Sequence, residues 1–182
     1  MNALIVDDEH AGRSTLHMLL RKYCAKEVTD ITTTDNLEEA KVLLKSTKFE
    51  VLFLDIQLKN KSGFDLIQYI PSTTKIIFVT AFSEFAIKAI KNRAFDYILK
   101  PVDPKELKAC VNQCNQEIAR SAKQHLIIKA RGKSVPLELA SIIYIKAKGP
   151  YAEIQLKSGN TYLTSQTLKT IALKLDEHFI RV

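Results

Sequence analysis

Short apolar runs alternate with amphipathic stretches through the first two thirds of the chain. Each run is bounded by polar or turn-forming residues, which is typical of strands buried on both faces of a parallel sheet. Five runs fit this pattern, at residues 4–6, 28–31, 51–54, 75–79 and 96–99. The stretches that follow them repeat apolar residues at helical spacing and predict five helices. Strands that alternate with helices predict an α/β fold built on a doubly wound parallel sheet.

Local signals mark several predicted helix starts. Asp35 and Glu38 have the spacing of a capping box, and Ser83 is placed to cap a helix through residues 85–90. Asp103 followed by Pro104 begins the last helix of this part, because aspartate favours the cap position and proline the first turn.

The pattern changes after residue 120. Short runs typical of antiparallel strands occur at residues 126–128, 134–137, 142–145, 151–156 and 161–163. One helix is predicted late, over residues 166–175. We therefore predict two domains, residues 1–120 and a smaller, mainly antiparallel β domain at 126–182, joined by a polar linker at 121–125.

Polar side chains follow four of the predicted parallel strands. Asp7 and Asp8 follow the first strand, Asp55 the third, Thr80 the fourth and Lys100 the fifth. The carboxyl ends of parallel strands lie at one edge of a sheet, where ligands bind in this class of fold. We therefore expect these side chains to meet in one cleft, although Asp55 alone would fit an ordinary cap or loop aspartate equally well.

Three carboxylates in one cleft repel one another, and a hard divalent cation relieves this repulsion. Mg²⁺ prefers oxygen ligands and keeps several waters, so two carboxylates and a phosphate oxygen suit it. Lys100 adds a positive charge on the other side of a bound anion. This combination predicts phosphoryl transfer to an aspartate, with Thr80 donating a hydrogen bond to the phosphoryl group.

Composition and charge restrict the class of protein further. The chain has 182 residues, 46% of them hydrophobic and 26% charged, which is typical of a globular protein. The sequence has no apolar run of membrane-spanning length and no leader-like start, so we expect a cytoplasmic protein. Of the net charge of +7, most falls in residues 124–182, which carry 9 basic and 4 acidic residues and so favour a polyanionic partner.

Three cysteines, Cys24, Cys110 and Cys114, form neither a disulfide framework nor a CxxC motif. Cys110 and Cys114 are one helical turn apart with no histidine beside them. Small buried residues on a helix face are favoured over a metal site there.

Several motifs occur together in the first 120 residues: Asp7-Asp8, Leu54-Asp55-Ile56, Gly63, Thr80-Ala81 and Asp96-Tyr97-Ile98-Leu99-Lys100-Pro101. In this combination they resemble the receiver domain of two-component response regulators. The resemblance implies a flavodoxin-like fold, and a phosphoryl group accepted on Asp55 from a sensor histidine kinase.

The resemblance also implies roles for the surrounding residues. Asp8, Asp55 and the backbone carbonyl of Gln57 would bind Mg²⁺ directly, and Asp7 would act through water. Thr80 and Tyr97 would form the switch pair, and Lys100-Pro101 would be a cis peptide. No enzymatic activity is implied beyond slow self-dephosphorylation, and a phosphorylation-linked homodimer is expected.

One position departs from the receiver pattern. Many receivers have proline four residues after the phosphorylated aspartate, and this chain has Lys59 there, within Lys59-Asn60-Lys61. The departure puts the loop geometry and the lifetime of the phosphoaspartate in question, but leaves the acceptor residue unchanged.

Three segments of the last third are informative: Ile143 to Tyr151, Tyr162 to Leu168 and Phe179 to Val182. They resemble the LytTR-type DNA-binding domain of LytR/AlgR regulators. The family usually continues past the last segment, so we expect a C-terminally truncated LytTR domain. We also expect an exposed strand edge near Val182 that pairs between chains.

The resemblance implies promoter DNA as the partner of this domain. Lys146, Lys148 and Tyr151 lie near one turn and are the candidates for phosphate or base contact. Exposed lysines and a packed tyrosine without such a role explain the same pattern nearly as well.

Three other classes of protein compete with a phosphorylation-controlled transcription regulator. A haloacid-dehalogenase-like phosphotransferase or phosphatase would need a DxD motif after the first strand, where this chain has Asp7-Asp8. A flavodoxin-like flavin carrier would need a phosphate-binding turn there, and three acids would repel phosphate. The remaining alternative is a protein-interaction adaptor whose truncated output domain does not bind DNA.

Overall fold

The computed structural model describes residues 1–59, 61–130, 132–175 and 179–180. The chain divides into two compact units, Met1–Glu117 and Ile118–Val182, which are described separately. No helix among the described residues combines the length and apolar character needed to cross a bilayer.

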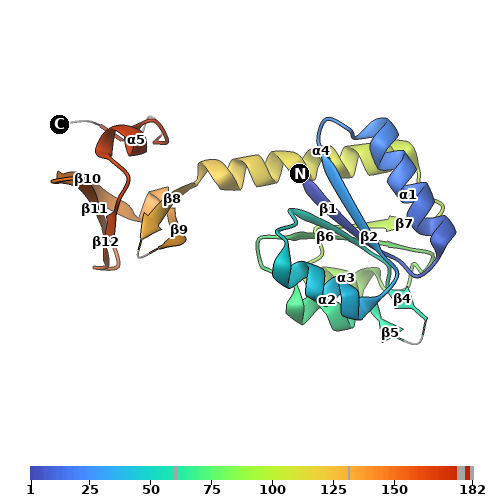
Figure 1. Ribbon diagram of the computed structural model, residues 1–182. Coiled ribbons are helices and arrows are strands. Elements are labelled where there is room, and N and C mark those ends of the chain that lie inside the picture. Colours follow the sequence, from blue (N-terminus) through green and yellow to red (C-terminus); the bar gives the residue numbers. More distant parts are fainter. Residues whose placement is uncertain (60, 131, 176–178, 181–182) are drawn as a thin grey trace. The chain divides into compact units, whose positions relative to one another are not determined.

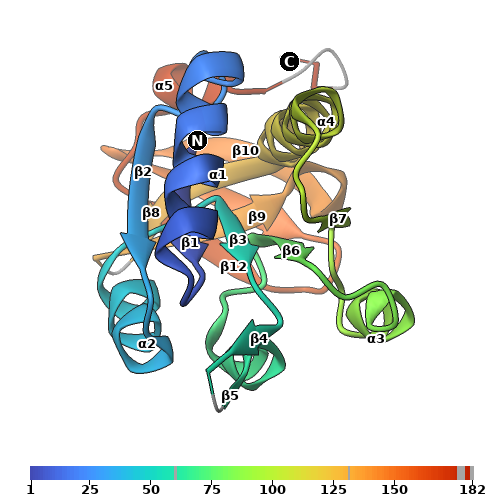
Figure 2. The ribbon, with the colours of Figure 1, turned by 90° about the vertical axis from the view of Figure 1, so that its right-hand side faces the viewer.

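A five-stranded parallel sheet forms the centre of the first unit (Figures 1 and 2). Its strands are β1 (Asn2–Val6), β2 (Asp30–Thr34), β3 (Val51–Leu54), β6 (Lys75–Thr80) and β7 (Asp96–Leu99). Their order in the sheet is β2-β1-β3-β6-β7, and every neighbouring pair is parallel. The predicted doubly wound α/β sheet is therefore confirmed.

Helices cover both faces of this sheet. They are α1 (His10–Tyr23), α2 (Leu37–Ser46), the 3₁₀ helix η1 (Gly63–Tyr69), α3 (Ala86–Lys91) and α4 (Pro104–Lys123). In Figure 2, α1 and α4 lie on one face and α2 and α3 on the other. Strand β3 is fully buried because both of its faces pack against helices, which explains its continuous apolar sequence.

Several local predictions were wrong in detail. The second strand is Asp30–Thr34 and not 28–31, because its pairing with β1 sets the register and an edge strand tolerates polar residues. Asn36, not Asp35, caps α2 through hydrogen bonds from the amides of Glu38 and Glu39. Ser83 is not the cap of α3, which begins after Phe85 without a side-chain cap.

The segment between β3 and η1 contains a short hairpin that the sequence did not predict. Strands β4 (Gln57–Leu58) and β5 (Lys61–Ser62) pair antiparallel and follow Asp55 directly. The hairpin brings the backbone of residues 57–59 next to the carboxyl edge of the parallel sheet.

The second unit is mainly antiparallel, as predicted. Its elements are β8 (His125–Ala130), β9 (Lys133–Glu138), the 3₁₀ helix η2 (Leu139–Ser141), β10 (Ile142–Lys148), β11 (Tyr151–Leu156), β12 (Thr161–Thr164) and α5 (Leu168–Ala172). Strands β8 and β9 form a hairpin, and β10, β11 and β12 form a separate sheet. Alternate residues of β8 and β11 pack with Ile171 of α5 in a small core.

Two boundaries of this part differ from the sequence prediction. Helix α4 continues to Lys123 and β8 begins at His125, so most of the predicted linker at 121–125 is the end of a helix. Helix α5 is shorter than the predicted 166–175. The predicted strand edge near Val182 lies outside the described residues.

Candidate functional site

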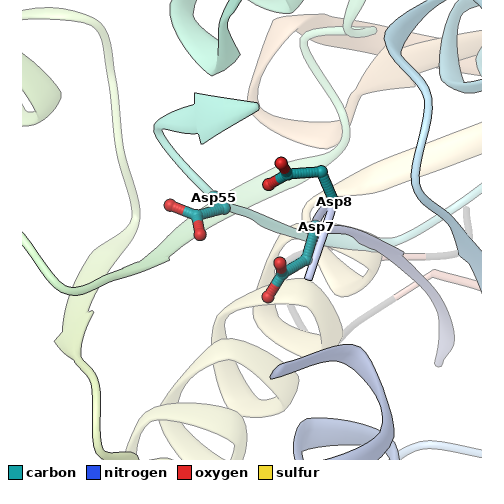
Figure 3. Close-up of side chains that lie close together, drawn as sticks. All are labelled: Asp7, Asp8 and Asp55. Carbon is teal, nitrogen blue, oxygen red and sulfur yellow. The ribbon is translucent and has the colours of Figure 1, made fainter. Parts of the chain in front are cut away.

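The two acidic segments of the site follow neighbouring strands. Val6 at the end of β1 is paired with Leu54 at the end of β3, so Asp7 and Asp55 emerge side by side. The backbone N–H of Asp55 donates to the carbonyl of Val6 at 2.9 Å, which extends the pairing to the first residue past the strand. Figure 3 shows the carboxylates of Asp7, Asp8 and Asp55 gathered at this edge.

These three carboxylates form a compact cluster. One oxygen of each lies within 4.8 Å of the others. Asp7 and Asp55 are 3% and 6% exposed, so most of their charge is removed from water, whereas Asp8 is half-buried. Clustered carboxylates require compensation by cations or hydrogen-bond donors because isolated buried charges are costly. The oxygen donors fit a hard divalent cation such as Mg²⁺.

Lys100 supplies part of the compensation. Its Nζ lies 2.6 Å from Oδ2 of Asp55 and 2.9 Å from Oδ2 of Asp7, with Glu9 further away at 3.5 Å. Burial opposes the charge of Lys100, but the hydrogen bonds to Asp55 and Asp7 outweigh it, so the pKa of the ammonium is raised. The peptide bond between Lys100 and Pro101 is cis, as predicted.

Asp7 is held in place by several hydrogen bonds. Its Oδ1 accepts from the backbone N–H of Glu9 at 2.9 Å, and its backbone carbonyl accepts from Nη1 of Arg13 at 2.6 Å. Burial nevertheless raises the pKa of Asp7, against the lowering effect of Lys100 and the Glu9 amide. Three carboxylates share the one ammonium of Lys100, which leaves a net negative site at the edge of the sheet.

Thr80 ends β6 and is fully buried. Its hydroxyl has no hydrogen-bond partner among the described residues, although its backbone carbonyl accepts from the N–H of Lys100 at 2.8 Å. An unpaired buried hydroxyl costs free energy, so its presence requires an explanation. Tyr97, on β7, is half-buried, and its hydroxyl donates to the backbone carbonyl of Phe82.

The β4–β5 hairpin contributes backbone groups to the site. The N–H of Gln57 donates to Oδ1 of Asp55 at 3.3 Å, and the N–H of Lys59 donates to Oδ2 of Asp8 at 3.0 Å. Gly63 packs so closely that a Cβ there would lie 2.1 Å from the carbonyl oxygen of Asp55. The amide contacts had no signal in the sequence, because every residue except proline carries an N–H.

The candidate DNA-contact residues lie in the second unit. Lys148 is paired with Tyr151 across strands β10 and β11, and all three candidates, Lys146 included, are exposed. Both lysines bind the same acid, with Nζ of Lys146 and of Lys148 at 2.8 and 2.7 Å from Glu153. Glu153 was not predicted from the sequence, because its position beside the lysines depends on strand register.

The fold and the acidic site define the first unit as a flavodoxin-like α/β domain with a lysine-bridged carboxylate cluster at its carboxyl edge. Comparison with known families identifies it further. Residues 3–112 match the response regulator receiver domain, and residues 132–182 match the LytTr DNA-binding domain. The chain therefore belongs to the response regulators that combine these two domains.

Curated relatives and solved structures agree with this assignment. The chain is 32% identical over its whole length to the sensory transduction protein LytR of Staphylococcus haemolyticus, and spans 81% of that protein. It is 30% identical to LytT of Bacillus subtilis, again over its whole length and 80% of the relative. The response regulatory domain of mrkE from Klebsiella pneumoniae superposes with a TM-score of 0.58 at 25% identity, covering 66% of this chain and 99% of that one.

A further solved structure is a Burkholderia pseudomallei response regulator with a phosphorylated aspartic acid, a calcium ion and citrate. Its TM-score is 0.51 at 25% identity, covering 70% of this chain and 76% of that one.

Proposed function

We propose that this protein accepts a phosphoryl group on Asp55 from a sensor histidine kinase and controls transcription through DNA binding by its second domain. The observation that carries the proposal is the position of Asp55, buried at the carboxyl edge of the sheet with Lys100 at 2.6 Å. The similar Burkholderia regulator, which contains a phosphorylated aspartic acid, supports it.

In the proposed reaction a carboxylate oxygen of Asp55 forms a new bond to phosphorus while the bond from phosphorus to the kinase histidine nitrogen breaks. Lys100 leaves its ion pair with Asp55 to bind an oxygen of the transferred group, so its charge stays compensated. Each transfer consumes the acceptor, so the protein is a phosphoacceptor, not an enzyme, and slow self-dephosphorylation restores it.

We assign Mg²⁺ to the carboxylate cluster. Asp8, Asp55 and the carbonyl of Gln57 would hold the ion directly, and Asp7 would act through water. The excess of carboxylates over ammonium groups in the cluster supports this assignment, because a net negative group of oxygen ligands favours a divalent cation. When bound, the ion supplies positive charge to the phosphoryl oxygens.

We propose Thr80 and Tyr97 as the switch pair. The hydroxyl of Thr80, buried and unpaired among the described residues, would gain a partner by donating to a phosphoryl oxygen. Tyr97 would then change its position and give up its present hydrogen bond to the backbone carbonyl of Phe82. The structural change would then reach the surface of β7, which carries Tyr97 and pairs with the strand of Thr80, and of α3, which contacts β7.

That surface is also the proposed site of a phosphorylation-linked homodimer. Ile87 and Ile90 of α3 are 70% and 73% exposed, and Leu99 of β7 is 42% exposed. Exposed apolar groups of this size favour burial against a partner. Sizing of the full chain before and after phosphorylation tests this, and an unchanged monomer in both states contradicts it.

The acceptor assignment is tested with acetyl phosphate and Mg²⁺. Intact-mass measurement should find one added phosphoryl group on the wild type and on Asp30→Asn, a control at an exposed position of β2. The Asp55→Asn variant should gain none. An Asp55→Asn protein that still takes up phosphate would contradict the assignment.

DNA binding separates the regulator from the protein-interaction adaptor. A regulator should bind duplex DNA with an affinity that falls steeply as salt rises, because phosphate contacts release counterions. Absence of such binding, with and without acetyl phosphate, would favour the adaptor. A cytoplasmic location remains a prediction from the sequence.

A further inference from the structure

One face of the β10–β12 sheet points away from the core of the second unit. The cross-strand pairs Lys148–Tyr151, Lys146–Glu153 and Glu153–Leu163 share a side, because directly opposed residues of antiparallel strands point the same way. The intervening residues Ala152 and Ile154 are fully buried and lie on the other side, in the core. We call the first side the outer face.

A groove lies at the end of the outer face that carries Tyr151. It encloses about 500 Å³ between the β8–β9 hairpin and strands β11 and β12. Its lining residues are all exposed: Lys129, Gly132, Lys133, Ser134, Tyr151, Leu163 and Ser165. Strands β8 and β12 are neighbours, so the two walls belong to one folded unit.

The groove is positively charged. Two of its lining residues are lysines and none is acidic. Among the ion pairs of the described residues, none involves Lys129 or Lys133. By contrast, Lys146 and Lys148 further along the outer face share Glu153. The lysines with the greater capacity to bind an external anion are therefore those of the groove.

We propose that the DNA backbone lies in this groove, with phosphates against Lys129 and Lys133. This inference rests on the proposed DNA-binding function and locates its phosphate contacts. The lining suits a phosphodiester strand, since ammonium groups supply charge and the hydroxyls of Ser134 and Ser165 supply neutral donors. Tyr151, half exposed at the same end of the sheet, presents both a ring and a hydroxyl to the strand.

The groove and two further lysines lie on the same face of the sheet. Lys146 and Lys148 project from the outer face that carries the groove's Tyr151 and Leu163. A DNA strand that contacts Lys129 and Lys133 would continue past Lys146 and Lys148, which are both ion-paired to Glu153. In this arrangement Lys129 and Lys133 provide most of the charge, and Lys146 and Lys148 contribute less until Glu153 releases them.

The test uses the full chain and a duplex of about three helical turns, whose sequence need not be the operator because phosphate contacts are read without base specificity. Affinity is measured over a series of salt concentrations for the wild type and for the double variant Lys129→Gln/Lys133→Gln. Each lost phosphate contact reduces the magnitude of the negative slope of log affinity against log salt by about 0.9, so the slope should become less steep by about two.

A matched control removes the same charge elsewhere in this unit. Lys157 and Lys169 are exposed and outside the groove lining, and Lys157 is at the opposite end of β11 from Tyr151. Lys157→Gln/Lys169→Gln should leave the slope close to that of the wild type. Thermal unfolding of each double variant establishes that all of them are folded.

The outcomes distinguish a failure of the groove proposal from a failure of the proposed DNA-binding function. Wild-type binding with equal slopes for the two double variants would overturn the groove and leave DNA binding intact. No salt-dependent binding by the wild type would overturn the DNA-binding function, and the groove proposal with it. A parallel titration with polyglutamate tests whether an acidic protein, and not DNA, occupies the groove. If the Lys129→Gln/Lys133→Gln variant loses polyglutamate binding and keeps the DNA binding of the wild type, the proposal is wrong.

Discussion

The backbone N–H of Lys59 donates a hydrogen bond of 3.0 Å to Oδ2 of Asp8 and so ties the β4–β5 hairpin to the acidic cluster. Lys59 has a φ of 52°, in the left-handed region. The proline that many receivers carry at this position could make neither the contact nor the conformation, because proline lacks an N–H and fixes φ near −65°. The departure noted in the sequence therefore adds a donor to a site that is short of positive charge.

The Lys59 contact predicts the effect of restoring proline. Lys59→Pro should lower the free energy of unfolding without Mg²⁺ by about 1–3 kcal/mol, the cost of losing a hydrogen bond to a charged acceptor. Lys59→Gly keeps the N–H and favours the left-handed conformation, so it should be at least as stable as the wild type. Urea unfolding measures both, and equal stability of the two variants would show that the amide contributes nothing.

Gly63 predicts a second effect on the site. In Gly63→Ala the new Cβ would lie 2.1 Å from the carbonyl oxygen of Asp55, and the backbone there must move. We expect a loss of about 1–3 kcal/mol in unfolding free energy, typical of overpacking, together with slower phosphorylation by acetyl phosphate.

Gly12→Ala serves as the comparison for Gly63→Ala. Its Cβ would lie 2.5 Å from Oδ2 of Asp7 and 3.2 Å from Nζ of Lys100, which are side-chain ends and yield more readily than the backbone carbonyl at Gly63, and alanine favours the helix. It should cost less, and the reverse order of the two variants would contradict the role of Gly63.

The sequence predicted the acids and Lys100 at one edge because residue type and strand order together fix that edge. It could not predict the Lys59 contact, because a backbone donor leaves no mark in the sequence. The predicted bounds of the edge strand β2 were wrong because its register follows from pairing with β1, not from its own apolar residues. The pairing of Glu153 with Lys146 likewise depends on register.

Cys114 predicts a pH dependence of stability at alkaline pH. Burial raises the pKa of this thiol from 9.0 to about 11, with Lys75 lowering it and Glu117 raising it by smaller amounts. A raised pKa means that the folded state holds the proton more tightly than the unfolded state. The free energy of unfolding therefore falls as pH rises from 9.0 to about 11.

Cys114→Ala isolates this contribution. Two units of pKa correspond to about 3 kcal/mol, so the stability difference between the wild type and the variant should shrink by up to that amount over the same pH range. Urea unfolding at a series of pH values measures the difference. A difference that does not vary with pH would mean that Cys114 does not titrate in this way.

Thr80 predicts a stabilising substitution that removes signalling. Thr80→Val keeps the shape of the side chain and removes the buried unpaired hydroxyl, so it should raise the free energy of unfolding by about 1 kcal/mol. The variant should still accept a phosphoryl group on Asp55, as intact mass would show. It should lose any change in dimerisation or DNA affinity that phosphorylation causes in the wild type. A destabilised variant would imply that the hydroxyl has a partner in the folded protein.

Glu153 predicts a gain in DNA affinity. Its carboxylate, 8% exposed, binds Lys146 and Lys148, and these two contacts lower its pKa and keep it ionised. Glu153→Gln keeps the size of the side chain and removes its charge, so both lysines become available to phosphates. If each freed lysine contacts one phosphate, the slope of log affinity against log salt should steepen by about 0.9 for each, or about two in all. Glu138→Gln removes an acid from the exposed end of β9 and serves as the control. Equal slopes for the two variants would mean that Glu153 does not restrain the lysines.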